Sequence, residues 1–127
     1  MLSSLEIELL SEPHLAQKVI EYFKDKYGKR FISALRAAEE GRVLKYQFVP
    51  SGVIAWTVQG RKREYLVVPE VYCSCRSFYQ SVVISRQCDV CYHLLAQKIA
   101  ESRGTFVTKH LDDDARRRLY KSWRRTD

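Results

Sequence analysis

The chain has 127 residues, of which 46% are hydrophobic and 12% aromatic. This composition suffices for one buried core, so we expect a single domain over residues 1–127. Its formal net charge is +7, and residues 61–127 hold most of the excess, which favours an acidic surface or nucleic acid as partner. No apolar run approaches the about 20 residues that span a bilayer, so we expect no membrane partner. The first residues are acidic where a secretory signal needs basic ones, so we expect an intracellular protein.

Residues 1–41 have the pattern of helices. Ser11 predicts the N-cap of a helix that ends at Gly28, because apolar residues follow it at steps of three and four. These residues are Leu15, Val19, Tyr22, Phe23 and Tyr27. The spacing of Phe31, Leu35 and Ala38 predicts a second short helix, which Gly41 would end.

Residues 42–70 change to the period of two that is typical of strands. Apolar residues alternate with polar ones in "VLKYQFV" and again in "VIAWTVQ", and "REYLVV" is a third candidate strand. The turn residues Pro50 and Gly52 separate the first two, and Gly60 precedes the third. This order predicts a three-stranded antiparallel meander.

Two further helices are expected after the cysteines. "YHLLAQKIAESRG" predicts a helix that ends at Gly104, and residues 110–125 predict a basic C-terminal helix. In that last segment acidic residues 112–114 complement a helix N-terminus, and apolar residues recur every four positions up to Trp123. The fold class is therefore α+β, divided into helices (1–41), a meander (42–70), a cysteine module (71–103) and the basic helix.

All four cysteines of the chain lie within 21 residues, together with a histidine. They are Cys73, Cys75, Cys88, Cys91 and His93. Disulfides are rare inside cells, and zinc takes four sulfur or nitrogen ligands in a tetrahedron, so one structural zinc ion is expected. A shell of four protein ligands leaves no position for catalysis, and the chain has no P-loop motif, so we expect neither an enzyme nor a small-molecule substrate.

Spacing leaves two ligand sets open. Cys73 and Cys75 are two residues apart after a strand, so both thiolates can face one ion. Cys91 and His93 would share that ion if Cys91 lies at or before a helix start and His93 in its first turn. The rival set replaces His93 with Cys88, because C-x-x-C is also a common zinc spacing.

The runs "YCSCRSF" and "CYHLLA" resemble the SWIM zinc finger, whose signature is C-x-C followed by C-x-H. An extended form, C-x-H-x-x-A, is matched through Ala96. The resemblance covers about residues 72–96 and implies that the ligands are Cys73, Cys75, Cys91 and His93. Cys88 lies outside the signature and remains the alternative ligand.

A short chain built mostly of a SWIM module resembles the SWIM subunit of the Shu complex, a family with archaeal members. The resemblance implies a subunit that binds a RecA-family recombinase paralog and assists homologous recombination and DNA repair, with single-stranded DNA as a further partner. It implies that Ala96 contributes to partner binding. The protein would be cytoplasmic in an archaeon and nuclear in a eukaryote.

The basic tail supports an alternative function, that of a stand-alone DNA-binding zinc protein. Cationic side chains would hold phosphates, and a nearby aromatic ring would stack on bases. The opposing interpretation is a solvated charged face whose apolar stripe, which includes Leu119 and Trp123, packs on the core. The candidate nucleic-acid-binding residues are Arg116, Arg117, Arg118, Lys121, Trp123, Arg124 and Arg125.

Overall fold

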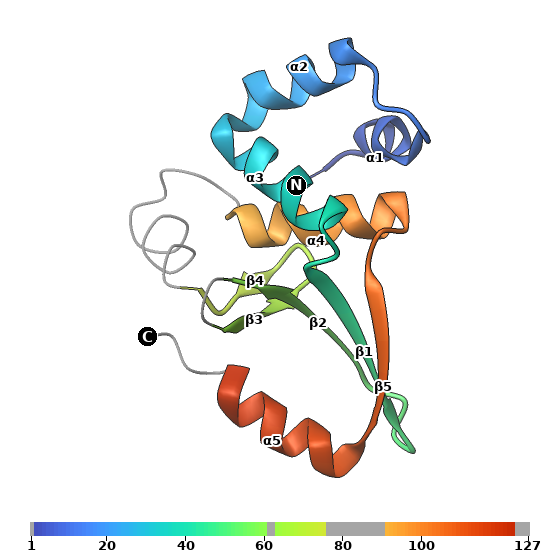
Figure 1. The fold of residues 1–127 in the computed structure, drawn as a ribbon, viewed down its shortest axis with the longest axis vertical. Coiled ribbons are helices and arrows are strands. Elements are labelled where there is room, and N and C mark those ends of the chain that lie inside the picture. Colours follow the sequence, from blue (N-terminus) through green and yellow to red (C-terminus); the bar gives the residue numbers. More distant parts are fainter. Residues whose placement is uncertain (1, 61–62, 76–90, 124–127) are drawn as a thin grey trace.

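The computed structural model describes residues 2–60, 63–75 and 91–123, and in this part of the chain it has five helices and five strands (Figure 1). The helices are α1 (Ser4–Ser11), α2 (Gln17–Tyr27), α3 (Lys29–Glu39), α4 (Tyr92–Arg103) and α5 (Asp113–Trp123). The strands are β1 (Val43–Val49), β2 (Ile54–Gln59), β3 (Glu64–Val68), β4 (Tyr72–Cys73) and β5 (Val107–Asp112). The α+β class is therefore confirmed.

The strands form one mixed sheet in the order β4-β3-β2-β1-β5. The first three strands pair antiparallel in sequence order, as the meander predicted. The sheet is larger than predicted, because β4 extends it antiparallel to β3 and β5 extends it parallel to β1. The helix α4 lies between β4 and β5 in the chain, and so connects the two edges of the sheet across one face (Figure 1).

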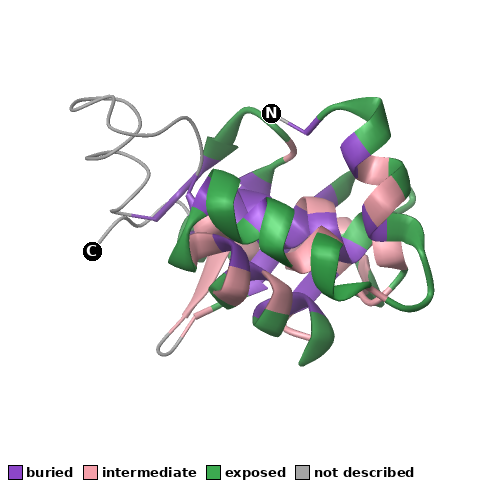
Figure 2. Ribbon diagram, turned by 90° about the horizontal axis from the view of Figure 1, so that it is seen from above, coloured by how far each residue is buried: buried purple, intermediate pink, exposed green. Residues whose placement is uncertain are grey.

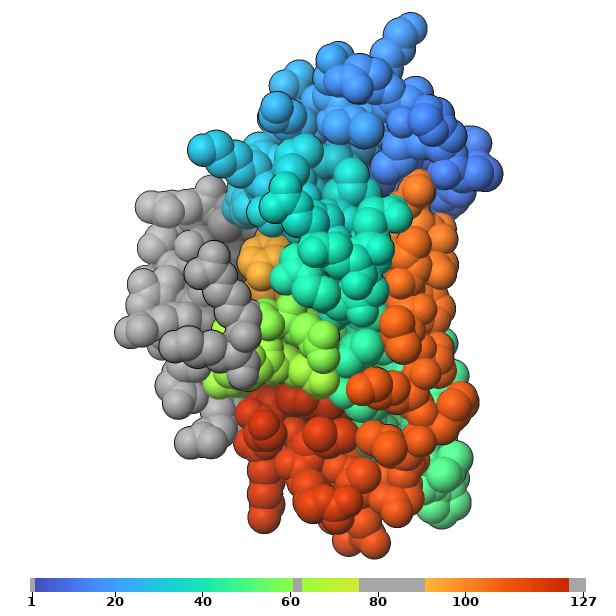
Figure 3. Space-filling view, in the orientation of Figure 1, coloured from blue at the N-terminus to red at the C-terminus, as the bar shows by residue number. Residues whose placement is uncertain are grey.

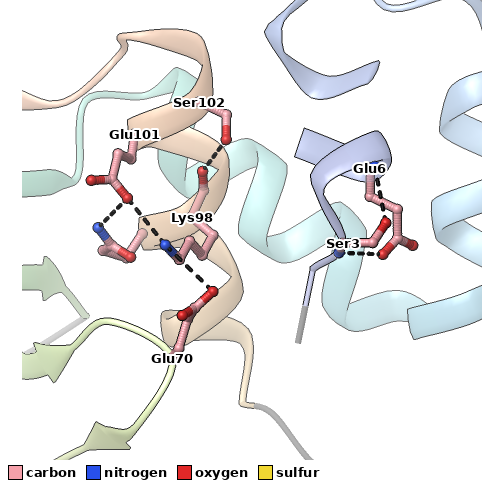
Figure 4. A network of polar contacts seen from close by, with 7 residues as sticks. Ser3, Glu6, Glu70, Lys98, Glu101 and Ser102 are labelled. Carbon is pink, nitrogen blue, oxygen red and sulfur yellow. Dashed lines mark hydrogen bonds and ion pairs between the residues drawn. The ribbon is translucent and has the colours of Figure 1, made fainter. Parts of the chain in front are cut away.

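The N-terminal helices differ from the prediction. Ser11 is the last residue of α1 rather than the N-cap of the next helix. Ser3 is the N-cap of α1 and forms a capping box with Glu6, in which each side chain accepts a hydrogen bond from the other residue's backbone N–H (Figure 4). The next helix begins at Gln17 without a side-chain cap and ends, as expected, at Gly28, whose φ is 71°.

The C-terminal helix is shorter than predicted. Its first predicted residues, 110–112, belong to β5, and α5 starts at Asp113. The carboxylate of Asp112 accepts a hydrogen bond from the backbone N–H of Ala115 at 2.7 Å, which caps the start of the helix. The side chain of Ser51 donates to Asp113 at 2.6 Å and fixes this end of α5 to the β1–β2 turn.

Each face of the sheet has its own hydrophobic cluster. Helix α4 packs on one face of the sheet, α1 and α3 pack on α4, and α2 packs on α3 (Figure 1). The hydrophobic cluster on this side includes Phe23, Phe31, Leu95 and Val58, all fully buried. Helix α5 covers the other face (Figure 1). There Trp123 packs in a smaller hydrophobic cluster with residues of β1 and β2. Buried and exposed residues alternate along the helices seen from above in Figure 2. In the described part of the chain, no helix has the length and apolar character that crossing a membrane requires.

Candidate metal centre

The edge of the sheet positions the first two cysteines. Cys73 is in β4, opposite Val67 of β3. Between the cysteines, Ser74 fixes the chain to the backbone of Leu66: its N–H donates to the Leu66 carbonyl, and its hydroxyl accepts from the Leu66 N–H, both at 3.0 Å. Because residues two apart in extended chain point the same way, Cys73 and Cys75 lie on one side, as the spacing predicted.

The start of α4 positions the other two ligands. Cys91 is the N-cap residue, with extended backbone angles of φ −89° and ψ 166°. His93 lies in the first turn of the same helix. This is the arrangement that the sequence required if both residues were to face one ion. The N-terminus of a helix carries partial positive charge, which favours a thiolate at Cys91.

The structure brings four ligand atoms to one point. The Sγ atoms of the three cysteines and a ring nitrogen of His93 all lie within 4.8 Å of one another. All four residues are buried, each with at most 5% of its surface exposed. Sulfur atoms around a tetrahedral zinc ion lie about 3.8 Å apart, given Zn–S bonds of about 2.3 Å. The cluster therefore has the composition and size to hold one zinc ion.

The chemistry of these donors also fits a cation. Both ring nitrogens of His93 are buried and lack a hydrogen-bond partner among the described residues, which is costly unless a metal binds one of them. Hydrogen bonds to Cys75 and Cys91, together with burial, raise the pKa of Cys73. A hydrogen bond with Cys73 lowers the pKa of Cys91, but Cys75 and burial outweigh it and raise that pKa to about 12. A bound cation would stabilise the thiolates that the crowded site otherwise disfavours.

Aromatic rings enclose the histidine. The ring centroids of Tyr65 and Tyr92 lie 4.7 Å and 4.0 Å from that of His93. The guanidinium of Arg63 lies over Tyr65 at 5.1 Å from the ring centroid. Such a site would be closed to solvent, and four protein ligands complete the tetrahedron, which is the form that structural zinc sites take.

An ion pair connects the two halves of the site. Lys98 of α4 lies 3.6 Å from the carboxylate of Glu70, which belongs to the turn before Cys73, and also 3.4 Å from Glu101 (Figure 4). Glu70 has a φ of 68°, a conformation unusual for a residue with a side chain. Sequence reasoning missed this pair and the role of Ser74, because neither residue belongs to a ligand motif.

The remaining predicted residues lie elsewhere. Ala96 is fully buried in the core on α4, so any effect on a partner would act through the packing of that helix. Cys88 lies outside the described residues, as do Arg124 and Arg125. Trp123 is only 2% exposed and packs on Tyr46, so its ring is not available to a base.

The basic residues of α5 are on the surface, and α5 lies on the opposite face of the sheet from the metal centre. Arg117, Arg118 and Lys121 are exposed, and Arg116 is half-buried. Arg116 and Arg117 each form an ion pair with an aspartate of the first turn, at 3.7 Å and 3.5 Å. The structure therefore does not bring the two candidate sites together.

Comparison with known proteins adds one relative. "Zinc finger SWIM domain-containing protein 7 homolog" of Dictyostelium discoideum is 28% identical over 89 residues, which are 68% of this chain and 57% of that protein. This similarity, joined to the buried cluster of the C-x-C and C-x-H residues, supports the resemblance. The chain is thus similar to SWIM zinc-finger proteins in sequence and in its ligand cluster. The match spans less than two thirds of the relative's length. None of the family models compared matches the chain, and no solved structure does.

Proposed function

We propose that this chain is a non-enzymatic SWIM interaction subunit, in which zinc builds a surface that binds a RecA-family recombinase paralog and so assists homologous recombination. The observation that carries the proposal is the buried, closed Cys3His cluster in a chain similar to a SWIM protein. Four protein ligands leave no coordination position for a substrate or an attacking water, which favours a structural ion. The identity of the partner rests on the resemblance to the SWIM subunit of the Shu complex.

Exposed apolar residues beside the cluster support a protein partner. Val68, Val71 and Tyr72 follow one another along β3, the next turn and β4, and they are 43%, 69% and 37% exposed. They directly precede the ligand Cys73, so zinc binding would fix the backbone that displays them. Large apolar side chains gathered on a surface are typical of protein interfaces. We therefore place the contact with the recombinase paralog at this edge of the sheet.

The test is an affinity pull-down from cells that express the protein natively, with nuclease added, read by mass spectrometry. Val71→Glu places a charge in the proposed contact. Val107→Glu is the matched control, because Val107 is 43% exposed on β5 at the opposite edge of the sheet. Both variants are first checked for unchanged zinc content and melting temperature.

The proposal predicts that a RecA-family ATPase is recovered in near-equal amount with the wild type and with Val107→Glu, and is lost with Val71→Glu. Recovery of only DNA-dependent partners that disappear with nuclease would contradict it. Equal recovery with both variants would show that the contact lies elsewhere than at this edge.

A further inference from the structure

Helix α5 is fixed to the sheet, so its basic residues stand on a rigid support. Trp123 donates its indole N–H to Glu64 at 3.1 Å, and the Tyr46 hydroxyl donates to the same carboxylate at 2.8 Å. The Arg63 guanidinium donates to the Trp123 carbonyl at 3.4 Å. Leu119 packs into the same cluster. The helix thus has one face held by the sheet and another turned to solvent (Figure 3).

The solvent side of α5 contains a depression of about 430 Å³ lined by Arg116, Arg117, Tyr120 and Lys121. Arg116 and Tyr120 are four residues apart, as are Arg117 and Lys121, so the residues form two neighbouring i,i+4 rows on one side of the helix. A volume of this size is in the range of small-ligand sites. Three cations beside one aromatic ring are the combination that binds phosphates and a base together.

The positive charge of the depression is only partly neutralised. The pair between Arg117 and Asp114 is about three-quarters exposed on both sides, so solvent screens it and an arriving phosphate can compete with it. Within the described part of the chain, no carboxylate pairs with Lys121 or with the neighbouring Arg118. An anion would therefore meet uncompensated charge here.

Further cations flank the helix. Lys109 of β5 lies over the ring of Tyr46 at 5.9 Å from its centroid, and that ring packs on Trp123. Arg63 reaches the C-terminal end of α5. Positive charge therefore continues beyond the depression around Trp123, at the C-terminal end of the anchored helix, as a strand longer than one nucleotide would need.

The aromatic ring indicates which form of nucleic acid fits. Tyr120 is half-buried, and its ring is held edge-to-face against Trp123 with the centroids 5.3 Å apart. A fixed ring that lines a cationic depression can stack on a base only if that base is unpaired. We propose that the depression formed by Arg116, Arg117, Tyr120 and Lys121 binds single-stranded nucleic acid, with the cations on phosphates and Tyr120 against a base.

The test is fluorescence anisotropy of a labelled oligo(dT) strand titrated with the zinc-loaded chain at several salt concentrations. Arg117→Glu/Lys121→Glu reverses two charges in the depression. Lys18→Glu/Lys24→Glu, on exposed positions of α2, is the matched control with the same change in net charge. Tyr120→Leu removes the ring and keeps the charges. All variants are compared at equal zinc content and melting temperature.

We expect the α5 double variant to bind the strand at least about tenfold more weakly than the wild type. The slope of log affinity against log salt concentration should become shallower by about 1.4, the value for two lost phosphate contacts on a single strand. The α2 control should stay within about twofold of the wild type, and Tyr120→Leu should weaken binding by about fivefold or more without changing the slope. Competition by unlabelled oligo(dT) and oligo(U) distinguishes DNA from RNA as the natural source of the strand.

Three results would overturn the proposal. The first is equal loss in both double variants, which would indicate attraction by net charge alone. The second is displacement of the probe by duplex DNA or polyglutamate as effectively as by oligo(dT). The third is no binding by the wild type at low salt.

Discussion

Removal of zinc should destabilise the whole domain, because the ion would connect distant parts of the chain. The C-x-C pair ends the meander and the C-x-H pair starts α4, and 15 residues separate Cys75 from Cys91. The three cysteines belong to the main hydrophobic cluster, and His93 is buried on the same helix as its members Leu94 and Leu95. Loss of the ion therefore frees α4 from the sheet edge as well as opening the site itself.

The magnitude has a lower bound from chain entropy. A cross-link that closes a loop of about 15 residues stabilises a protein by about 3 kcal/mol. The ring nitrogens of His93, which have no hydrogen-bond partner among the described residues, and the crowded thiols add to the cost in the metal-free form. For a domain of this length, a loss of about 3 kcal/mol lowers the melting temperature by roughly 10 °C.

The assay is thermal unfolding by circular dichroism before and after chelation, with a reductant present. The reductant is needed because, once zinc is removed, two of Cys73, Cys75 and Cys91 could form a disulfide, which would cross-link the chain in place of the metal. Elemental analysis confirms that zinc has left, and re-addition of zinc should restore the original transition. A melting temperature unchanged within about 2 °C after verified removal would refute the structural role of the ion.

Other predictions concern the packing around the site. Trp123→Ala should lower the free energy of unfolding by about 3–5 kcal/mol, measured by urea denaturation, because the side chain is 2% exposed; a loss below about 1 kcal/mol would contradict the docking of α5. Glu6→Gln should cost about 1–3 kcal/mol at pH 7. Burial raises the pKa of Glu6, but hydrogen bonds, led by that with Lys26, outweigh it and leave the pKa below 4.5. The difference in unfolding free energy between the wild type and Glu6→Gln should therefore be full above pH 4.5 and shrink as the pH falls further. A difference that is constant with pH would oppose this. Arg103→Lys should cost about 1–2 kcal/mol, because the guanidinium donates to three backbone carbonyls in residues 10–13 and a lysine cannot reach all of them; an unchanged urea midpoint would be the contrary result.

Local patterns predicted the elements whose signals are local. The alternation around Tyr46 and Trp56 placed β1 and β2, and Gly104 marked the end of α4. The requirement that Cys91 precede the helix and His93 lie in its first turn was correct, because it follows from helix geometry alone. The choice between His93 and Cys88 needed the family resemblance, since both spacings suit zinc.

The missed elements depend on contacts distant in sequence or on a signal that was overlooked. Strand β5 is almost wholly exposed and has no clear alternation, and it forms through parallel pairing with β1 more than 60 residues earlier. Helix α1 did have a local signal, the S-x-x-E capping box of Ser3 and Glu6, but Ser11 was interpreted as the cap instead. For Trp123 the sequence allowed both packing and base stacking, and only its burial distinguishes them.

The central claim is that Cys73, Cys75, Cys91 and His93 together bind one zinc ion. X-ray absorption at the zinc edge of the purified chain tests it most directly, together with elemental analysis. The account predicts one zinc per chain with three sulfur ligands at about 2.3 Å and one nitrogen at about 2.0–2.1 Å. A shell of four sulfurs would contradict it and favour Cys88 as the fourth ligand, and a chain purified under reducing conditions without zinc would contradict it outright.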